Sequence, residues 1–171
     1  MTRPFIEHVW VKLKSVPLIK SKLASTLMVL FLDFDGVLHP DPPNSSNPLW
    51  CRTELLVNWL ESRPDVEVVV SSTWRHGHNL QELQNLVPPG LACRLVGCTG
   101  LVHEELYARQ RECEEWMREN RDPWVHWVAL DDRVWNFRPF EKRLIPCPRS
   151  TGINLQVLQA LDKLSRSPMD T

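Results

Sequence analysis

Several short, largely apolar runs in this chain end at a polar or acidic residue, and this pattern constrains the fold more than any other feature. Three of these runs, each with the residue that follows it, are Leu27–Leu32 with Asp33, Val66–Val70 with Ser71, and Val125–Leu130 with Asp131. An apolar run of about 4–8 residues is typical of a strand buried on both faces, as the strands of parallel sheets are. We therefore expect parallel strands whose carboxyl ends carry the polar residues.

Segments with helical periodicity separate these runs. Apolar residues between 49 and 60 fall on one helical face, and Asn47 with Pro48 is expected to start that helix. Further helices are predicted over 79–86, 103–119 and 153–164, and further strands over 91–96 and 144–147. In the helix over 103–119, one side is expected to carry Leu106, Cys113, Trp116 and Met117. Such alternation predicts a three-layer α/β domain with a mostly parallel sheet of about five strands.

The 171 residues are enough for one domain, which we place at 28–171, after a basic leader over 1–27 that we expect to be flexible. A formal net charge of −1 argues against a strongly basic nucleic-acid coat. Five cysteines without a C-x-x-C pair indicate free thiols and a cytoplasmic protein. Cys93 and Cys98 lack the second pair that a zinc site needs. The longest apolar run near the start is too short to span a membrane.

Two acidic clusters follow predicted strands, Asp33-Phe34-Asp35-Gly36 and Asp131-Asp132. Taken alone, the first cluster is also typical of an Asx turn at a strand end, and Asp131-Asp132 is also typical of a solvated turn. The carboxyl ends of parallel strands meet at one edge of the sheet, so the clusters are expected to lie together. Two unit charges ~4 Å apart repel by roughly 4 kcal/mol at an effective dielectric constant of about 20. The clusters therefore need a cation or protons, and hard oxygen ligands favour Mg²⁺.

Hydroxyl and basic side chains complete the candidate site. Ser71 and Ser72 follow a strand, where hydroxyl and backbone N–H groups can bind a phosphoryl group, although this motif taken alone favours simple capping of the strand end. Arg109 lies on a highly charged predicted helix and offers a positive charge, whereas most arginines on such helices are solvated. His76 and His78 are interpreted as loop residues. Most of the eight tryptophans, among them Trp59, Trp116 and Trp127, are expected in the core.

In chain order these pieces resemble the haloacid dehalogenase (HAD) superfamily of phosphohydrolases, and therefore imply a Rossmann-like fold. More narrowly, the sequence is similar to the HAD domain of Swiss-Army-Knife RNA repair proteins. The motifs that carry this resemblance are DFDGVLHP, SSTWR, R-x-x-x-C-x-x-W-M, and WVALDDR followed by Thr-Gly-Ile. They span residues 28 to about 165.

The resemblance implies a role for each matching residue. Asp33 is the nucleophile that forms an aspartyl-phosphate, and Asp35 is the general acid and base, with a backbone carbonyl that helps to hold Mg²⁺. Asp131 is a metal ligand, and Asp132 binds the metal directly or supports the ligands. Ser72, or Ser71 if the strand ends earlier, binds the phosphoryl group. Arg109 takes the place of the usual lysine of this superfamily.

The spacing between motifs leaves no room for a folded lid domain, so we expect an open site. Small lids in this superfamily often accompany large substrates, which makes a nucleic-acid end or a phosphoprotein plausible. The leading hypothesis is a Mg²⁺-dependent phosphatase on a phosphorylated substrate. The alternatives are a nucleic-acid end-processing phosphatase in RNA repair, and a non-catalytic module that binds phosphate or protein.

Overall fold

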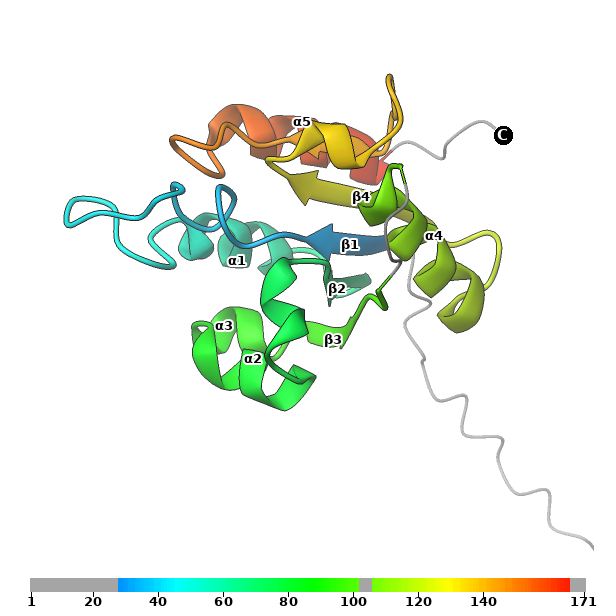
Figure 1. Cartoon of the computed structure of the whole chain (residues 1–171), viewed down its shortest axis with the longest axis horizontal. Helices are drawn as coiled ribbons and strands as arrows, with labels where there is room; N and C mark the ends of the chain where they lie inside the picture. The colour runs from blue at the N-terminus through cyan, green and yellow to red at the C-terminus, as the bar shows by residue number, and fades with distance from the viewer. Residues whose placement is uncertain (1–27, 102–105, 167–171) are drawn as a thin grey trace, which may run out of the picture.

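Five parallel strands form a single sheet in the order β3-β2-β1-β4-β5. The computed structural model describes residues 28–101 and 106–166, so the predicted leader over 1–27 lies outside the described residues, and the domain boundary stays a prediction. The strands are β1 (Met28–Leu32), β2 (Val66–Val70), β3 (Leu95–Cys98), β4 (His126–Asp131) and β5 (Leu144–Pro146). Since β1 is the central strand, the residue that follows it leaves the sheet at its middle (Figure 1).

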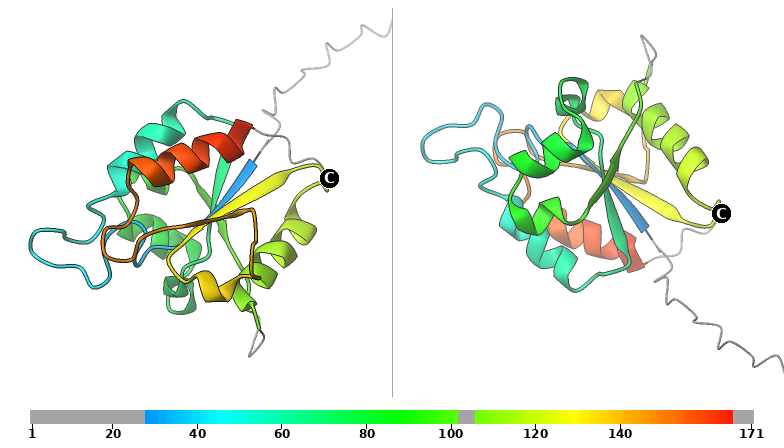
Figure 2. Two further views of the ribbon diagram at one scale, coloured as in Figure 1. Left: turned by 90° about the horizontal axis from the view of Figure 1, so that it is seen from above. Right: turned by 90° about the horizontal axis from the view of Figure 1, so that it is seen from below.

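Helices cover both faces of the sheet, which gives the three layers expected from the sequence (Figure 2). The α-helices are α1 (Thr53–Glu61), α2 (Leu80–Leu86), α3 (Pro89–Ala92), α4 (Ala108–Asn120) and α5 (Leu155–Arg166), with 3₁₀ turns η1 (Thr73–His76) and η2 (Val134–Asn136). The side chains of Met28, Leu30 and Leu32 pack with α1, α2, α3 and α5. Val29 and Phe31 point to the opposite face, where α4 packs.

The α4 face of the sheet has an aromatic core. Phe31 is fully buried, and its ring contacts Trp116 and Trp127 edge-on, with ring centroids 5.8 and 5.5 Å apart. Cys113 and Met117 of α4 are buried in the same cluster. Edge-to-face contacts of this kind add about 0.5–1.5 kcal/mol beyond the burial of their area. The predicted core position of Trp59 and Trp127 is confirmed, since both are buried, and Trp116 is partly buried against the same cluster as Trp127, whereas Trp124 and Trp135 are 78% and 62% exposed.

The register of the sheet aligns the ends of three strands. Leu32 is level with both Val70 and Leu130, so the residues that follow them leave the sheet at the same height. The backbone N–H of Asp33 donates to the Leu130 carbonyl, and that of Ser71 to the Leu32 carbonyl, both at 3.0 Å. The expectation that the polar strand ends share one edge is therefore confirmed.

The third strand lies further along the chain than predicted. The sequence suggested a strand over 91–96, but Pro89–Ala92 forms α3, and the strand is Leu95–Cys98. Pro88 and Pro89 begin a helical turn, in which Leu91 is buried against the core. A buried apolar residue in a short helix cannot be told from one in a strand by periodicity alone.

Two helices start later than expected. The helix predicted to begin at Pro48 begins at Thr53, and Leu49 is 45% exposed, because Pro48–Arg52 forms turns in which Trp50 has a φ of 66°. The helix predicted over 103–119 is Ala108–Asn120, and residues 102–105 lie outside the described part. Leu106 is 74% exposed, so its assignment to the buried side was wrong. By contrast, the helix predicted over 79–86 agrees with α2, which Asn79 caps in a capping box with Glu82.

Within residues 28–101 and 106–166, every helix is too short or too polar to cross a lipid bilayer.

Truncation of Phe31 tests the packing of the α4 face. Phe31→Ala removes a fully buried ring and both of its edge-to-face contacts, so the free energy of unfolding should fall by about 3–5 kcal/mol. Phe140 is 99% exposed, and Phe140→Ala should change it by less than about 0.5 kcal/mol. Urea unfolding followed by circular dichroism measures the free energy of unfolding of both variants. Equal decreases in the two variants would contradict the packing of Phe31.

Candidate active site

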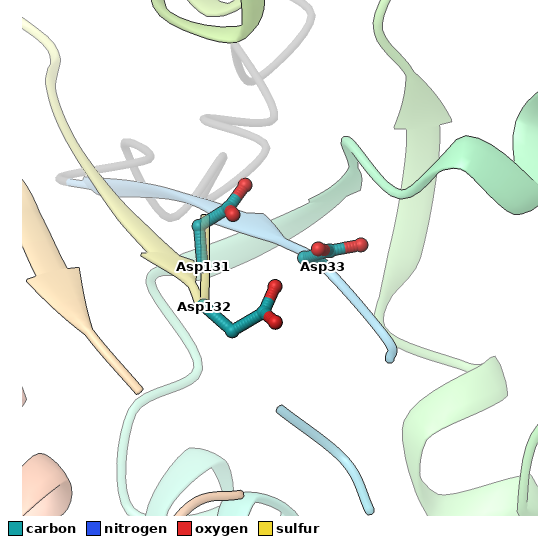
Figure 3. A group of neighbouring side chains, drawn as sticks. All are labelled: Asp33, Asp131 and Asp132. Carbon is teal, nitrogen blue, oxygen red and sulfur yellow. The ribbon is translucent and has the colours of Figure 1, made fainter. Parts of the chain in front are cut away.

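Three carboxylates from two adjacent strands meet at the carboxyl edge of the sheet. Asp33 follows β1, Asp131 ends β4, and Asp132 follows it (Figure 3). Each offers one oxygen, and these three oxygens lie within 4.8 Å of one another. All three side chains are 5% exposed or less, so little water screens their mutual repulsion.

Arg109 lies among these carboxylates rather than in solvent. Its Nη1 is 2.8 Å from Oδ2 of Asp131 and 3.7 Å from Oδ2 of Asp33, and the residue is only 4% exposed. Burial alone lowers the pKa of the Arg109 guanidinium, but the two carboxylates outweigh it, and its pKa is raised above the ordinary value. The alternative of a solvated arginine is therefore excluded. Arg109 partly neutralises Asp33 and Asp131.

Asp131 and Asp132 have different partners. Both oxygens of Asp131 accept hydrogen bonds, one from Arg109 and the other from the backbone N–H of Arg133. Both oxygens of Asp132 are buried without a hydrogen-bond partner among the described residues, although Arg133 and Arg149 lie 4.0 and 3.8 Å away. A buried carboxylate without partners is costly, so Asp132 is the side chain best suited to bind a cation.

Gly36 allows the loop after β1 to approach Asp132 closely. Its φ is +72°, a conformation that L side chains rarely adopt, and a Cβ at this position would lie 2.7 Å from Cγ of Asp132. The glycine in the sequence Asp33-Phe34-Asp35-Gly36 therefore permits both the turn and the contact. The chain turns at Gly36 as its sequence position suggests, but the expectation that the turn brings Asp33 and Asp35 to face one pocket is wrong, because Asp35 faces His39 and Trp74 instead.

The two candidate phosphate-binding serines follow β2 at the same edge. Ser71 and Ser72 are both buried. The Ser72 hydroxyl has no hydrogen-bond partner among the described residues. An unsatisfied buried hydroxyl is uncommon in folded proteins, and a ligand oxygen would satisfy it. Between the two alternatives left open by the sequence, this observation favours Ser72.

A buried ion pair that sequence reasoning missed connects these parts. Glu112 of α4 accepts from Arg75 Nη2 at 2.5 Å, and its carboxylate lies 3.5 Å from Nε of Arg109. Arg75 also donates to the backbone carbonyls of Ser71, Ser72 and Thr99, and so fixes the loops after β2 and β3. The one available signal was the spacing of Glu112, three residues after Arg109, because Arg75 lies 37 positions away in the chain.

Asp35 lies outside the group of three carboxylates. Its Oδ1 is 3.1 Å from Nε2 of His39, and its Oδ2 accepts from Nε1 of Trp74 at 2.9 Å. The hydrogen bond with His39 is the main cause that lowers the pKa of Asp35, which burial opposes only in part. Asp35 is therefore ionised at neutral pH, with each oxygen engaged. The proposed contact of its backbone carbonyl with a metal stays a prediction.

Neither the two cysteines nor the histidines after β2 belong to the group of metal-ligating side chains found among the described residues. Cys93 and Cys98 are free thiols, of which Cys93 is exposed and Cys98 half-buried. Nδ1 of His78 lies 3.1 Å from the carbonyl of Trp74, and the ring stacks on that tryptophan. The interpretation of His78 as a loop residue agrees with this packing.

Residues 29–158 match the family model described as the HAD domain in Swiss Army Knife RNA repair proteins. This match covers most of the chain, and the fold is an α/β sheet of the Rossmann-like HAD type, so the chain belongs to this family. No curated protein matches it.

Burial of Asp131 predicts how stability depends on pH. Burial, with the charge of Asp33 and in spite of Arg109, raises the pKa of Asp131 to about 7, above its ordinary value. The folded protein then binds a proton that the unfolded chain releases near pH 4. In the presence of a chelator, the stabilisation from Asp131 should therefore be lost as the pH rises from about 4 to about 7, by at most about 1.4 kcal/mol per pH unit.

Urea unfolding at several pH values in this range tests the expectation. His126, whose pKa burial lowers, acts in the opposite direction, so the informative quantity is the difference between wild type and Asp131→Asn. The pH dependence from Asp131 should be absent in that variant and present in the exposed control Asp122→Asn. If the free energy of unfolding changed with pH by the same amount in wild type and in Asp131→Asn, the raised pKa of Asp131 would be contradicted.

Proposed function

We propose that the protein is a Mg²⁺-dependent phosphatase that acts through an aspartyl-phosphate at Asp33. One observation carries the proposal: a buried group of three carboxylates in which both oxygens of Asp132 lack a hydrogen-bond partner among the described residues, with Arg109 beside the group. Membership of the HAD family supports a phosphatase or RNA repair role. A phosphate ester carries the charge that Arg109 and a bound cation would attract.

The donor set fits Mg²⁺. Carboxylate oxygens are hard ligands, and two of them, both on Asp132, are buried and unsatisfied. Asp33, Asp131 and Asp132 would hold the ion, together with the backbone carbonyl of Asp35. Bound Mg²⁺ would neutralise the negative charge that the carboxylates and the phosphate bring together.

The reaction would use two residues after β1 in turn. Asp35, which is ionised in the free protein, would first take up a proton from the solvent as the anionic phosphate ester binds beside it. A carboxylate oxygen of Asp33 attacks phosphorus, the bond from phosphorus to the leaving oxygen breaks, and Asp35 gives that proton to the leaving oxygen. Asp35 then takes a proton from water, which attacks phosphorus, and the bond to Asp33 breaks to release inorganic phosphate. The backbone N–H of Phe34 donates to Oδ1 of Asp33 at 2.9 Å and orients the nucleophile.

Arg109 and Ser72 would hold the transferring group. Arg109 stands where the resemblance places a lysine, and its planar guanidinium can hold a phosphoryl group with two donors. The Nη1 of Arg109 is already directed at Asp131 and Asp33. The Ser72 hydroxyl would donate to another phosphoryl oxygen. A cytoplasmic location is part of the proposal, since all five cysteines are free thiols.

Replacement of the nucleophile tests this function. Asp33→Asn should lower the Mg²⁺-dependent release of phosphate from an aryl phosphate by at least about 10³-fold, because an amide cannot attack phosphorus. The control Asp122→Asn changes an exposed aspartate and should retain full activity. Full activity in Asp33→Asn would refute the nucleophile. Binding of Mg²⁺ without turnover of any phosphate ester would indicate a non-catalytic module instead.

A phosphorylated nucleic-acid end is the second candidate substrate. Two arginines stand beside Asp132, of which Arg149 is 51% and Arg133 33% exposed. Their exposed charge is suited to a second phosphate of a strand whose terminal phosphate lies at Asp33. The RNA repair description of the family favours the same substrate class.

Measurements on a 3′- or 5′-phosphorylated oligonucleotide test this candidate. Arg149→Ala should raise KM for the oligonucleotide and reduce the slope of log affinity against log salt by about 0.7, the value of one phosphate contact on a single strand. KM for the aryl phosphate, which carries no second phosphate, should rise much less than KM for the oligonucleotide, although Arg149 also lies 3.8 Å from Asp132. Arg118, 70% exposed in the last turn of α4, provides the matched control Arg118→Ala. A KM unchanged in Arg149→Ala would contradict the strand contact.

A further inference from the structure

Two N–H donors from different segments engage the carboxylate of Asp35. His39, four residues further along the loop, has its Nε2 at 3.1 Å from Oδ1. Trp74, in η1 after β2, donates from Nε1 to Oδ2 at 2.9 Å. We call this arrangement of Asp35, His39 and Trp74 the Asp35 clamp. It fixes both oxygens of the carboxylate, and therefore the direction in which its remaining lone pairs point.

The chemistry of the indole ring identifies Trp74 as one donor, and burial identifies the nitrogen of His39 that carries the hydrogen. An indole nitrogen can only donate, so Trp74 supplies a proton to Oδ2. His39 is 0% exposed, and its Nδ1 has no hydrogen-bond partner among the described residues. A buried N–H without an acceptor is less tolerable than a bare lone pair, so the hydrogen resides on Nε2 and points at Asp35. Each oxygen of Asp35 keeps a second lone pair, which is free to carry a transferred proton.

The two donor rings are themselves held in place. Trp50 contacts both edge-on, with ring centroids 5.4 Å from His39 and 5.3 Å from Trp74. Phe34 packs edge-on against Trp50 and Trp74. Trp50 has a φ of 66°, a sparsely populated conformation for a bulky residue that persists only where the surroundings enforce it. Three separate chain segments therefore converge to support the clamp.

We propose that His39 and Trp74 are positioning residues that hold Asp35 in the orientation needed to exchange a proton with the leaving group. This inference rests on the proposed function. The clamp fixes the orientation of the Asp35 carboxylate before substrate binds, since both donors already contact it. A group displaced by about 1 Å can lose about 10²-fold in rate.

The dependence of rate on the leaving group tests the inference. Trp74→Phe keeps an aromatic ring but removes the N–H donor. It should lower kcat/KM for glycerol 2-phosphate, an alkyl ester that needs protonation, by about 10²-fold. Its kcat/KM for 2,4-dinitrophenyl phosphate, whose leaving group needs no proton, should stay within about twofold of wild type. This ratio reports the steps up to phosphorylation of Asp33 and not the later attack of water, in which Asp35 also acts. His39→Leu should behave in the same way, and His39→Gln, which keeps an N–H donor, should restore most of the lost rate.

Trp59 offers a matched control for the tryptophan substitution. It is 8% exposed, packs in the core, and its Nε1 has no partner among the described residues. Trp59→Phe makes the same chemical change without loss of a hydrogen bond, so the ratio of the kcat/KM values for the two substrates should equal that of wild type. Equal losses on both substrates in Trp74→Phe would show a structural effect only and would overturn the clamp.

A spectroscopic measurement separates the inference from the proposed function. In ¹H–¹⁵N spectra of the metal-free protein, the indole resonance absent from Trp74→Phe belongs to Trp74. Asp35→Ala should move that resonance upfield and accelerate its exchange with water, while the Trp59 resonance stays in place. An unmoved Trp74 resonance would refute the clamp. A wild-type protein that hydrolyses no phosphate ester would refute the proposed function, while the spectra still decide whether the clamp exists.

Discussion

The parallel register of β1 and β4 places Asp33, Asp131 and Asp132 side by side, and the repulsion among their buried carboxylates governs the rest of the site. Their oxygens lie within 4.8 Å of one another in a region with little water. This charge adds to the effect of burial, which already raises the pKa of Asp131, and both oxygens of Asp132 lack a hydrogen-bond partner among the described residues. Buried negative charge of this density is stable only beside positive charge, and this explains why the guanidinium of Arg109 is buried next to the carboxylates.

Arg109 depends in turn on α4 and on the loops that surround it. Glu112, one turn later in α4, faces Arg109 and pairs with Arg75, which binds the carbonyls after β2. Charges of alternating sign thus extend from the carboxylates through Arg109 and Glu112 to Arg75. The same network fixes the loop that presents Ser72. A guanidinium has several donors and can contact a carboxylate on each side, as Arg109 does here, whereas an ammonium presents a single charged nitrogen.

The loops at this edge also separate the two proposed catalytic aspartates. Asp33 and Asp35 are two positions apart, yet one faces the carboxylate cluster and the other faces His39 and Trp74. Gly36 makes this possible, because its positive φ turns the chain directly after Asp35. The pKa of Asp35 is lowered while that of Asp131 is raised, so neighbouring carboxylates have different proton affinities. Such divergence is typical of sites that carry out acid–base chemistry.

The sequence alone determined the strand ends and the residues placed there. Apolar runs that stop at Asp33, Ser71 and Asp131 required parallel strands, and such strands bring their carboxyl ends to one edge whatever the order in the sheet. Periodicity could not place β3, because Leu91 is buried equally well in a short helix. Only the tertiary structure decided that Arg109 is buried, that Glu112 pairs with Arg75, and that Trp74 donates to Asp35. These contacts join residues 22, 37 and 39 positions apart in the chain. The hydrophobic pattern of a segment indicates which of its faces is buried, but it does not indicate which side chain of a distant segment packs against that face.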